Sequence, residues 1–138
     1  MRDGRRVLAI VCGVVVLLAA SGIAVANTAR WHHLRSVRVA VSNPSLPPPS
    51  GKPQTTTFGP GHGLRRAQHA LNANDIRRLA KPRKSTAACT GGYDVTIKVV
   101  RHNGTVLKMS AYRCGGTTYG RVGGNLPGFL NAVGISPP

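Results

Sequence analysis

The sequence predicts a small single α+β domain, in which an antiparallel β-hairpin or a three-stranded sheet is packed by short helices and braced by one disulfide. Three observations lead to this fold class. Two alternating segments flank an Asn-Gly pair, short segments of helical periodicity lie on both sides of them, and one cysteine stands near each end of the alternating region. The domain is expected to span residues 62–138, the size of one small domain.

The hairpin is the strongest local signal. Residues 93–102 and 105–113 alternate between apolar and polar side chains, and Asn103-Gly104 between them suits the two positive φ angles of a type I′ turn. In that register Asp94 lies opposite Arg113 as a favourable cross-strand pair. The expected apolar face comprises Tyr93, Val95, Ile97, Val99, Val106 and Tyr112.

Two cysteines, Cys89 and Cys114, remain once Cys12 has left with the N-terminal segment. We expect this pair to brace the hairpin. The predicted register places Cys114 opposite Tyr93, which brings Cys89, four residues upstream, near its partner. In an oxidising compartment the pair is expected to form a disulfide. Closing a loop of about 25 residues would contribute about 3 kcal/mol. No metal site is expected, because these cysteines lack metal-ligand spacing and the histidines are scattered.

Two short helices are predicted before the hairpin. An apolar face at helical spacing predicts the first over residues 64–71. Asn74 or Asp75 is expected to cap the second, over residues 76–80, which Pro82 ends.

A glycine-rich segment and a last helix follow the hairpin. Residues 115–124 hold so many glycines that a mobile loop is expected there. Asn125 then caps a helix over residues 126–133, with Pro127 tolerated in its first turn and Gly134 as the C-cap. The apolar face of this helix is expected to cover the hairpin.

The first 26 residues are typical of an export signal. A basic start is followed by an apolar run over residues 7–20 and by a small-residue cleavage site before Asn27. The alternative is an uncleaved anchor, since residues 7–26 are long enough to span about 30 Å of hydrocarbon. Both interpretations place the remainder outside the cytoplasm, either secreted or held at the outer face of the membrane by one N-terminal anchor.

Residues 27–61 are predicted to be an extended linker. Residues 43–61 are rich in proline, which favours polyproline II over a packed core. Within residues 27–42, Val37, Val39 and Val41 alternate like a strand, yet Leu34, Val37 and Val41 also fit one helical face, so the segment stays open as a strand, a helix or a juxtamembrane stalk.

The charge balance excludes most enzyme classes. Lys and Arg number 19 against 3 acidic residues, a formal charge of +16, and the acids are Asp3, Asp75 and Asp94. General acid–base pairs and hard-metal sites are built from carboxylates, so neither is expected here. The protein is predicted to be no enzyme and to need no cofactor.

Basic residues between positions 65 and 84 are the candidate binding site. The predicted residues are Arg65, Arg66, Arg77, Arg78, Lys81, Arg83 and Lys84. The expected partner is an anionic envelope polymer or membrane surface, with a protein partner as the other option. Specific nucleic-acid recognition is not expected, because no recognition module appears.

The function predicted from these observations is that of an exported, non-catalytic, small basic domain of the cell envelope or extracellular space that binds an anionic surface or partner. The alternative is a secreted protein ligand, such as a protease inhibitor that presents Arg121 on the glycine-rich loop.

Overall fold

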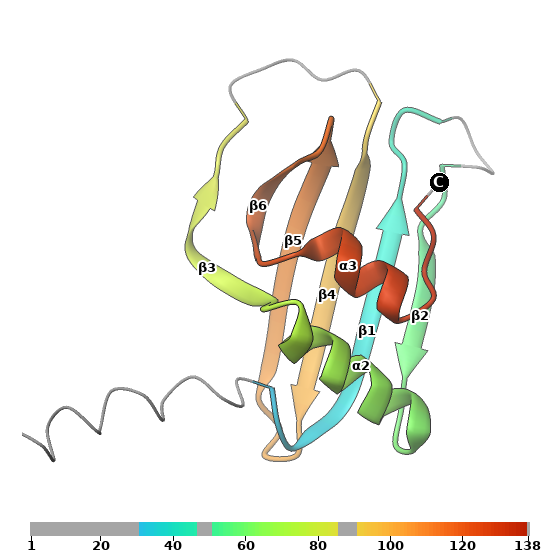
Figure 1. The fold of residues 1–138 in the computed structure, drawn as a ribbon, viewed down its shortest axis with the longest axis vertical. Helices are drawn as coiled ribbons and strands as arrows, with labels where there is room; N and C mark the ends of the chain where they lie inside the picture. The colour runs from blue at the N-terminus through green and yellow to red at the C-terminus, as the bar shows by residue number, and fades with distance from the viewer. Residues whose placement is uncertain (1–30, 47–50, 86–90, 138) are drawn as a thin grey trace, which may run out of the picture. The chain divides into compact units, whose positions relative to one another are not determined.

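The computed structural model describes residues 31–46, 51–85 and 91–137, which belong to one compact unit, Trp31–Pro138. Its strands form a six-stranded antiparallel sheet in the order β2-β1-β4-β5-β6-β3 (Figure 1). The elements are β1 (Leu34–Ser42), β2 (Gln54–Phe58), α2 (His62–Ala73), β3 (Arg77–Arg83), β4 (Tyr93–Arg101), β5 (Val106–Cys114), β6 (Thr117–Gly123) and α3 (Leu126–Ala132). The predicted signal or anchor, residues 1–26, lies outside the described residues.

The predicted fold class, built on a hairpin or three-stranded sheet packed by short helices, is wrong. The sheet has six strands because segments predicted to be linker, helix and loop pair on both sides of the hairpin. Cys89 lies outside the described residues, so a bond from it to Cys114 is not among the contacts that the structure describes. Cys114 itself is buried at the end of β5, with its Sγ 3.0 Å from the carbonyl oxygen of Gly91.

The segment predicted to be a linker contains two strands of the sheet, β1 and β2. β1 lies between β2 and β4, and its valines Val37, Val39 and Val41 are buried. Burial of every second residue is expected for a strand that has one face covered and the other exposed. The domain boundary predicted at residue 62 therefore differs from the structure, in which the compact unit begins at Trp31.

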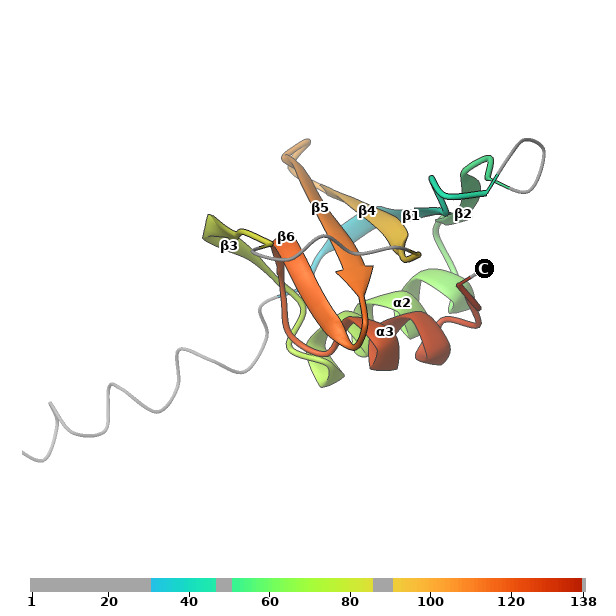
Figure 2. The same ribbon diagram turned by 90° about the horizontal axis from the view of Figure 1, so that it is seen from above.

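Both helices cover the same face of the sheet (Figure 2). α2 and α3 confirm the helices predicted over residues 64–71 and 126–133. Their apolar faces pack on the sheet and form one core with it. The fully buried larger side chains include Trp31, Phe129, Leu71, Ile76, Ile97, Met109, Leu126 and Leu130.

The helix predicted over residues 76–80 is the edge strand β3, and the predicted mobile loop contains β6. Asp75 has a φ of 49°, which ends the helical path of α2 before β3 begins. Gly115 and Gly116 have φ angles of 56° and 90°, the signs that a type I′ turn needs, and they connect β5 to β6. Pairing with a neighbouring strand thus overrides weak local preference in both segments.

The predicted hairpin forms, but its register is one residue away from the prediction. Arg101 N–H donates to the Thr105 carbonyl across a three-residue loop, and Gly104 takes the left-handed conformation at φ 82°. Asp94 therefore lies opposite Tyr112, not Arg113. Because side chains alternate, this shift places Met109 and Ala111 in the core in place of Val106 and Tyr112.

Replacing Asn125 by alanine is expected to lower the free energy of unfolding by about 1 kcal/mol. The Asn125 side chain accepts a hydrogen bond from the Gly128 N–H, at 3.1 Å, and so caps α3. Urea denaturation followed by circular dichroism measures the effect. Asn131→Ala, an exposed change within the same helix, is the control, and equal losses for the two variants would contradict the capping role.

Candidate functional site

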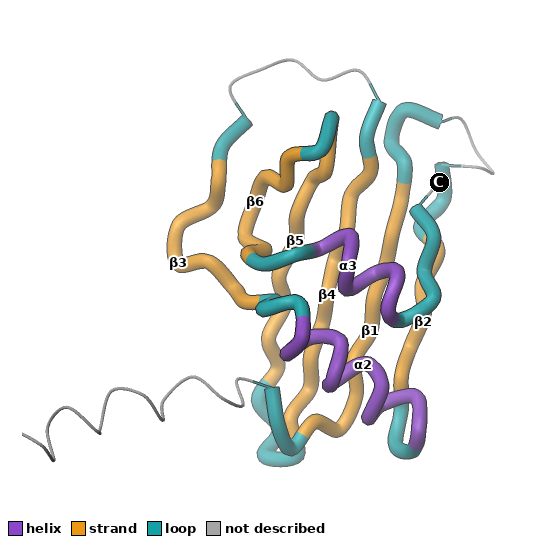
Figure 3. Tube along the Cα trace, viewed as in Figure 1, coloured by secondary structure: helices purple, strands orange, loops and turns teal. Residues whose placement is uncertain are grey.

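The face of the sheet opposite the helices is the candidate functional site, and it is called the open face here. Figure 3 shows the helices crossing one side of the strands only. Because Val37, Val39, Ile97 and Val99 point into the core, their even-numbered neighbours on β1 and β4 point to the open face. The open face is thus built by strand alternation from residues scattered along the chain.

Three cations stand side by side across the middle of the open face. Arg38 of β1 pairs with Lys98 of β4, and Lys98 pairs with Lys108 of β5. All three side chains are exposed. Residues directly opposite one another on antiparallel strands have Cβ atoms about 4.5–5.5 Å apart. We call Arg38, Lys98 and Lys108 the cationic row.

Like charges directly opposite one another destabilise a sheet. Asp94, the carboxylate of β4, lies four residues from Lys98, about 13 Å along the strand. Asp75 lies beyond the end of α2 and pairs with Arg77. The repulsion within the cationic row is therefore not offset by a described carboxylate beside it, which makes the row a place where an anion would be stabilised.

Three hydroxyl side chains and one alanine occupy the next position along the strands. Thr55, Ala40, Thr96 and Ser110 follow one another across β2, β1, β4 and β5. Thr96 Oγ1 and Ser110 Oγ are 3.1 Å apart and share a hydrogen bond. Thr55, Ala40 and Thr96 border an open hollow of about 620 Å³ together with the cationic row; its lining residues are Arg38, Ala40, Thr55, Thr96, Lys98, Val106 and Lys108. Cations and neutral hydroxyls thus meet in one concave surface.

A smaller hollow, of about 270 Å³, extends this surface along the strands. It shares Arg38 and Lys98 with the larger one and adds Ser36, Thr57 and Val100. The two hollows therefore flank the same two cations. A ligand that follows the strands would pass over the cationic row rather than end at it.

The basic residues predicted from the sequence are divided between two places. Arg65 and Arg66 lie at the beginning of α2, whereas Arg77, Arg78, Lys81, Arg83 and Lys84 lie on or just after β3. β2, against which α2 begins, and β3 are opposite edges of the sheet, about 24 Å apart at five strand spacings. The structure thus does not bring the predicted residues together as one patch.

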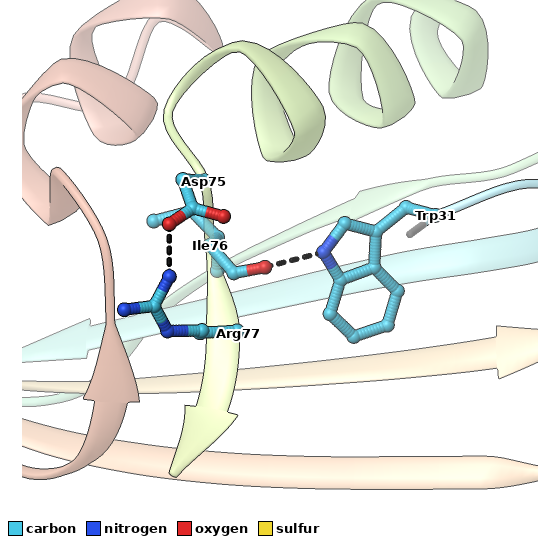
Figure 4. Close-up of polar contacts among 4 residues, drawn as sticks. All are labelled: Trp31, Asp75, Ile76 and Arg77. Carbon is cyan, nitrogen blue, oxygen red and sulfur yellow. Dashed lines mark hydrogen bonds and ion pairs between the residues drawn. The ribbon is translucent and has the colours of Figure 1, made fainter. Parts of the chain in front are cut away.

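Two of these arginines already have partners within the fold. Arg77 forms an ion pair with Asp75 (Figure 4). Arg66 Nε donates a hydrogen bond to the Ala132 carbonyl, at 2.8 Å, and so links α2 to α3. On β3 the charges and Pro82 also suit an exposed edge strand, where they discourage pairing with another chain. Both observations give these residues a structural role.

The cationic row was not predicted from the sequence, although each member carries a local signal. Arg38, Lys98 and Lys108 each stand between two apolar residues, which is the mark of an outward position on a half-buried strand. The positions are far apart in the chain. Only the strand pairing shows that they adjoin.

Arg121, the residue on which the inhibitor alternative depends, lies in β6. Its guanidinium donates a hydrogen bond to the Ala80 carbonyl, at 2.9 Å, and thereby joins β6 to β3. An inhibitory loop must present its side chain to a protease. No observation in this part of the structure favours that alternative.

The described residues offer little for metal or proton chemistry. Across residues 31–46, 51–85 and 91–137, no three His, Cys, Asp or Glu side chains lie together as metal ligands would. Burial raises the pKa of the Tyr93 hydroxyl, and the nearby charge of Arg113 partly opposes this. Tyr93 packs against the core rather than on the open face.

In the same described ranges, none of the helices is long and apolar enough to cross a membrane.

Fold and surface together define a small antiparallel sheet domain with two helices on one face and, on the other, a polar, cationic face that no described element covers. Comparison of the chain with known protein families, with curated proteins and with solved structures finds no match.

Proposed function

We propose that this protein is an exported, non-catalytic domain of the cell envelope or extracellular space that binds an anionic polymer on the open face of its sheet. The observation that carries the proposal is the cationic row, Arg38, Lys98 and Lys108, in direct register on three adjacent strands. Such a row costs stability in the free protein and is relieved when an anion lies across it.

The shape of the site favours a chain-like ligand. The row spans two strand spacings, about 10 Å, and open hollows lie on both sides of it. Arginine presents a planar fork to phosphate or carboxylate oxygens, and lysine acts as a point charge. Hydroxyls of Thr55 and Thr96 can hydrogen-bond polar groups between the charges. A phosphodiester or polycarboxylate chain fits this arrangement of donors.

The chain's overall charge and its N-terminus support a location where such polymers are found. The formal charge of +16 attracts polyanions over a distance set by salt. Residues 1–26 carry the pattern of an export signal or anchor. Outside the cytoplasm the available polyanions are wall polymers and lipid headgroups, and a concave surface suits a single polymer chain better than a flat bilayer.

Neutralising the cationic row is expected to weaken binding to a glycerol-phosphate polymer at least about tenfold at 0.15 M salt. The variant carries Arg38→Gln, Lys98→Gln and Lys108→Gln, and fluorescence anisotropy of labelled polymer measures the dissociation constant. The slope of log K against log salt should fall by about 2, since about 0.7 counterions are released per neutralised charge on a flexible chain.

A matched variant with Arg65→Gln, Arg78→Gln and Lys81→Gln removes the same charge from other exposed positions. It should change the dissociation constant by no more than about threefold, as expected for screened, distant charges. Equal weakening in both variants would mean that net charge alone attracts the polymer. Unchanged binding in the first variant would remove the open face as the site. Urea denaturation should show the first variant at least as stable as the natural protein, because the repulsion is gone.

A further inference from the structure

A further hollow lies on the open face, on the other side of the hydroxyl groups of Thr96 and Ser110 from the cationic row. Its volume is about 320 Å³, and its lining residues are Asp94, Val95, Thr96, Ser110, Ala111, Tyr112 and Gly120. Thr96 also lines the hollow beside the cationic row, so the two hollows adjoin. A ligand that follows β4 and β5 away from the cationic row would therefore enter this further hollow.

Strand pairing sets an acid and two tyrosines in line at this end of the sheet. Asp94 of β4 lies opposite Tyr112 of β5, and Tyr112 lies opposite Tyr119 of β6. The residues next to them on β4 and β5, Val95 and Ala111, are buried in the core, so by alternation these three side chains point to the open face. We call Asp94, Tyr112 and Tyr119 the tyrosine row.

Asp94 has no cationic partner although the chain is strongly basic. The formal charge of the chain is +16, yet among the described residues the Asp94 carboxylate forms neither an ion pair nor a hydrogen bond. The side chain is exposed. An ionised carboxylate only accepts hydrogen bonds. Asp94 therefore suits a ligand that brings hydroxyl donors and opposes one that brings a phosphate to this position.

The two tyrosines do not pack on each other. Aromatic side chains on facing strand positions commonly interact, but in the part of the chain that the structure describes Tyr112 and Tyr119 have no ring contact. A side chain at Gly92 would collide with the phenol end of Tyr112, so the Tyr112 ring leans along the sheet into space that this glycine leaves. Both side chains are half-buried. Their rings thus offer apolar surface beside a carboxylate and hydroxyl groups.

We propose that the tyrosine row binds a sugar unit, and that the polymer bound on the open face carries sugars as well as anionic groups. The C–H face of a sugar ring is apolar and packs on an aromatic ring, while the sugar hydroxyls donate to Asp94 and exchange hydrogen bonds with Thr96 and Ser110. Asp94 and Lys98 are about 13 Å apart along β4, so one polymer chain reaches both rows. The inference rests on the proposed function for the anionic part of the ligand.

Single-stranded nucleic acid is the competing ligand, because it also combines stacking on aromatic rings with phosphate contacts. The position of Asp94 favours the sugar. A base stacked on Tyr112 would bring its own phosphates towards this carboxylate, which repels them, whereas a neutral sugar brings hydroxyl donors. The two ligands are therefore separated by their response to the charge of Asp94.

The test compares a labelled glycerol-phosphate polymer with the same polymer carrying glucosyl groups, both bound to the full protein and followed by fluorescence anisotropy. The natural protein should bind the glucosylated polymer at least about fivefold more tightly, the effect of one stacked ring and one hydrogen bond to a charged group. Equal affinity for the two polymers would overturn the inference and leave the proposed function standing. Failure to bind either polymer would overturn both.

Replacing both tyrosines by threonine, Tyr112→Thr with Tyr119→Thr, keeps side chains that suit a strand. The preference for the glucosylated polymer should fall below about twofold, while affinity for the bare polymer stays within about twofold, because the cationic row is intact. The control, Tyr112→Phe with Tyr119→Phe, keeps the rings and should keep most of the preference. Full preference in the threonine variant would overturn the role of the rings.

Asp94→Asn should change the two affinities in opposite directions. Binding of the bare polymer should tighten by up to about threefold because a negative charge is removed, whereas the preference for the glucosylated polymer should fall at least about twofold. An unchanged preference would overturn the role assigned to Asp94.

Two further measurements separate the tyrosine row from its alternatives. The variant that neutralises Arg38, Lys98 and Lys108 should bind both polymers more weakly and keep the ratio of their affinities; loss of the ratio would show that the sugar is not bound at a row of its own. Oligothymidylate of similar charge should bind less tightly than the glucosylated polymer. Tighter binding of oligothymidylate that the threonine variant abolishes would mean that the rings stack bases, and would overturn the inference.

Discussion

Replacing Trp31 by alanine is expected to lower the free energy of unfolding by about 3–5 kcal/mol, the cost of removing a large buried aromatic side chain. Trp31 is 2% exposed and belongs to the core cluster. Its Nε1–H donates to the Ile76 carbonyl, at 2.5 Å (Figure 4). Urea denaturation followed by circular dichroism is the suitable measurement, because the variant lacks the tryptophan fluorescence signal.

The result decides where the folded domain begins. Asn72 exchanges two hydrogen bonds with the Trp31 backbone, so the main chain of residue 31 is tied to α2 and its side chain to Ile76, just after α2. Trp31→Phe keeps most of the apolar volume but leaves the Ile76 carbonyl without its donor, and should cost about 1–3 kcal/mol. Leu46→Ala is the control, since Leu46 is exposed in the segment predicted to be a linker, and it should stay within about 0.5 kcal/mol. A loss at Trp31 as small as this would contradict its place in the core and a folded domain that begins at this residue.

Replacing Gly124 by alanine is expected to lower the free energy of unfolding by about 2–5 kcal/mol. Gly124 has a φ of 94°, a conformation that costs an alanine about 1–2 kcal/mol. A Cβ at this position would also overlap the backbone carbonyl groups of Asn74 and Asp75. Overpacking against a rigid backbone adds about 1–3 kcal/mol. The free energy of unfolding from urea denaturation tests the sum.

Gly104 provides the matched control for this substitution. Its φ is 82°, close to that of Gly124, but a Cβ built there meets nothing within 4 Å. Gly104→Ala should therefore show the conformational cost alone, about 1–2 kcal/mol. Similar losses at both glycines would mean that the end of β6 does not pack closely on the end of α2. In the structure, the Asn125 N–H donates a hydrogen bond to the Asn74 carbonyl, at 2.8 Å, and this bond joins the segment after β6 to the segment after α2.

Elements with strong signals of their own were predicted correctly from the sequence. The apolar spacing around Leu64 and Leu71 predicts α2, and the Asn125 cap predicts α3, because a helix is closed by bonds within its own segment. The two strands around Asn103-Gly104 were also found. Their register was not, since a two-residue and a three-residue loop both fit an Asn-Gly sequence, and packing of Met109 and Ala111 in the core selects the second.

The remaining strands depend on partners that no local pattern reveals. β1 alternates in the manner of a strand, but its sequence fits a helix too until β4 is placed beside it. β3 is rich in basic residues and contains Pro82, which argues against a central strand and is compatible with the edge that it occupies beside β6. The glycines of β6 lower its strand propensity, and pairing with Ala111 and Tyr112 outweighs this.

The sites show the same division between local and tertiary information. Charge, the export pattern and the scarcity of carboxylates belong to the sequence alone, and they predict a basic, non-catalytic protein directed at anions, which stays a prediction. Local density of basic residues pointed to positions 65–84, which the fold divides between α2 and β3. The cationic row comes from residues that are distant in the chain and adjacent in the sheet. Backbone pairing between strands is non-local, so only the folded sheet decides which side chains share a surface.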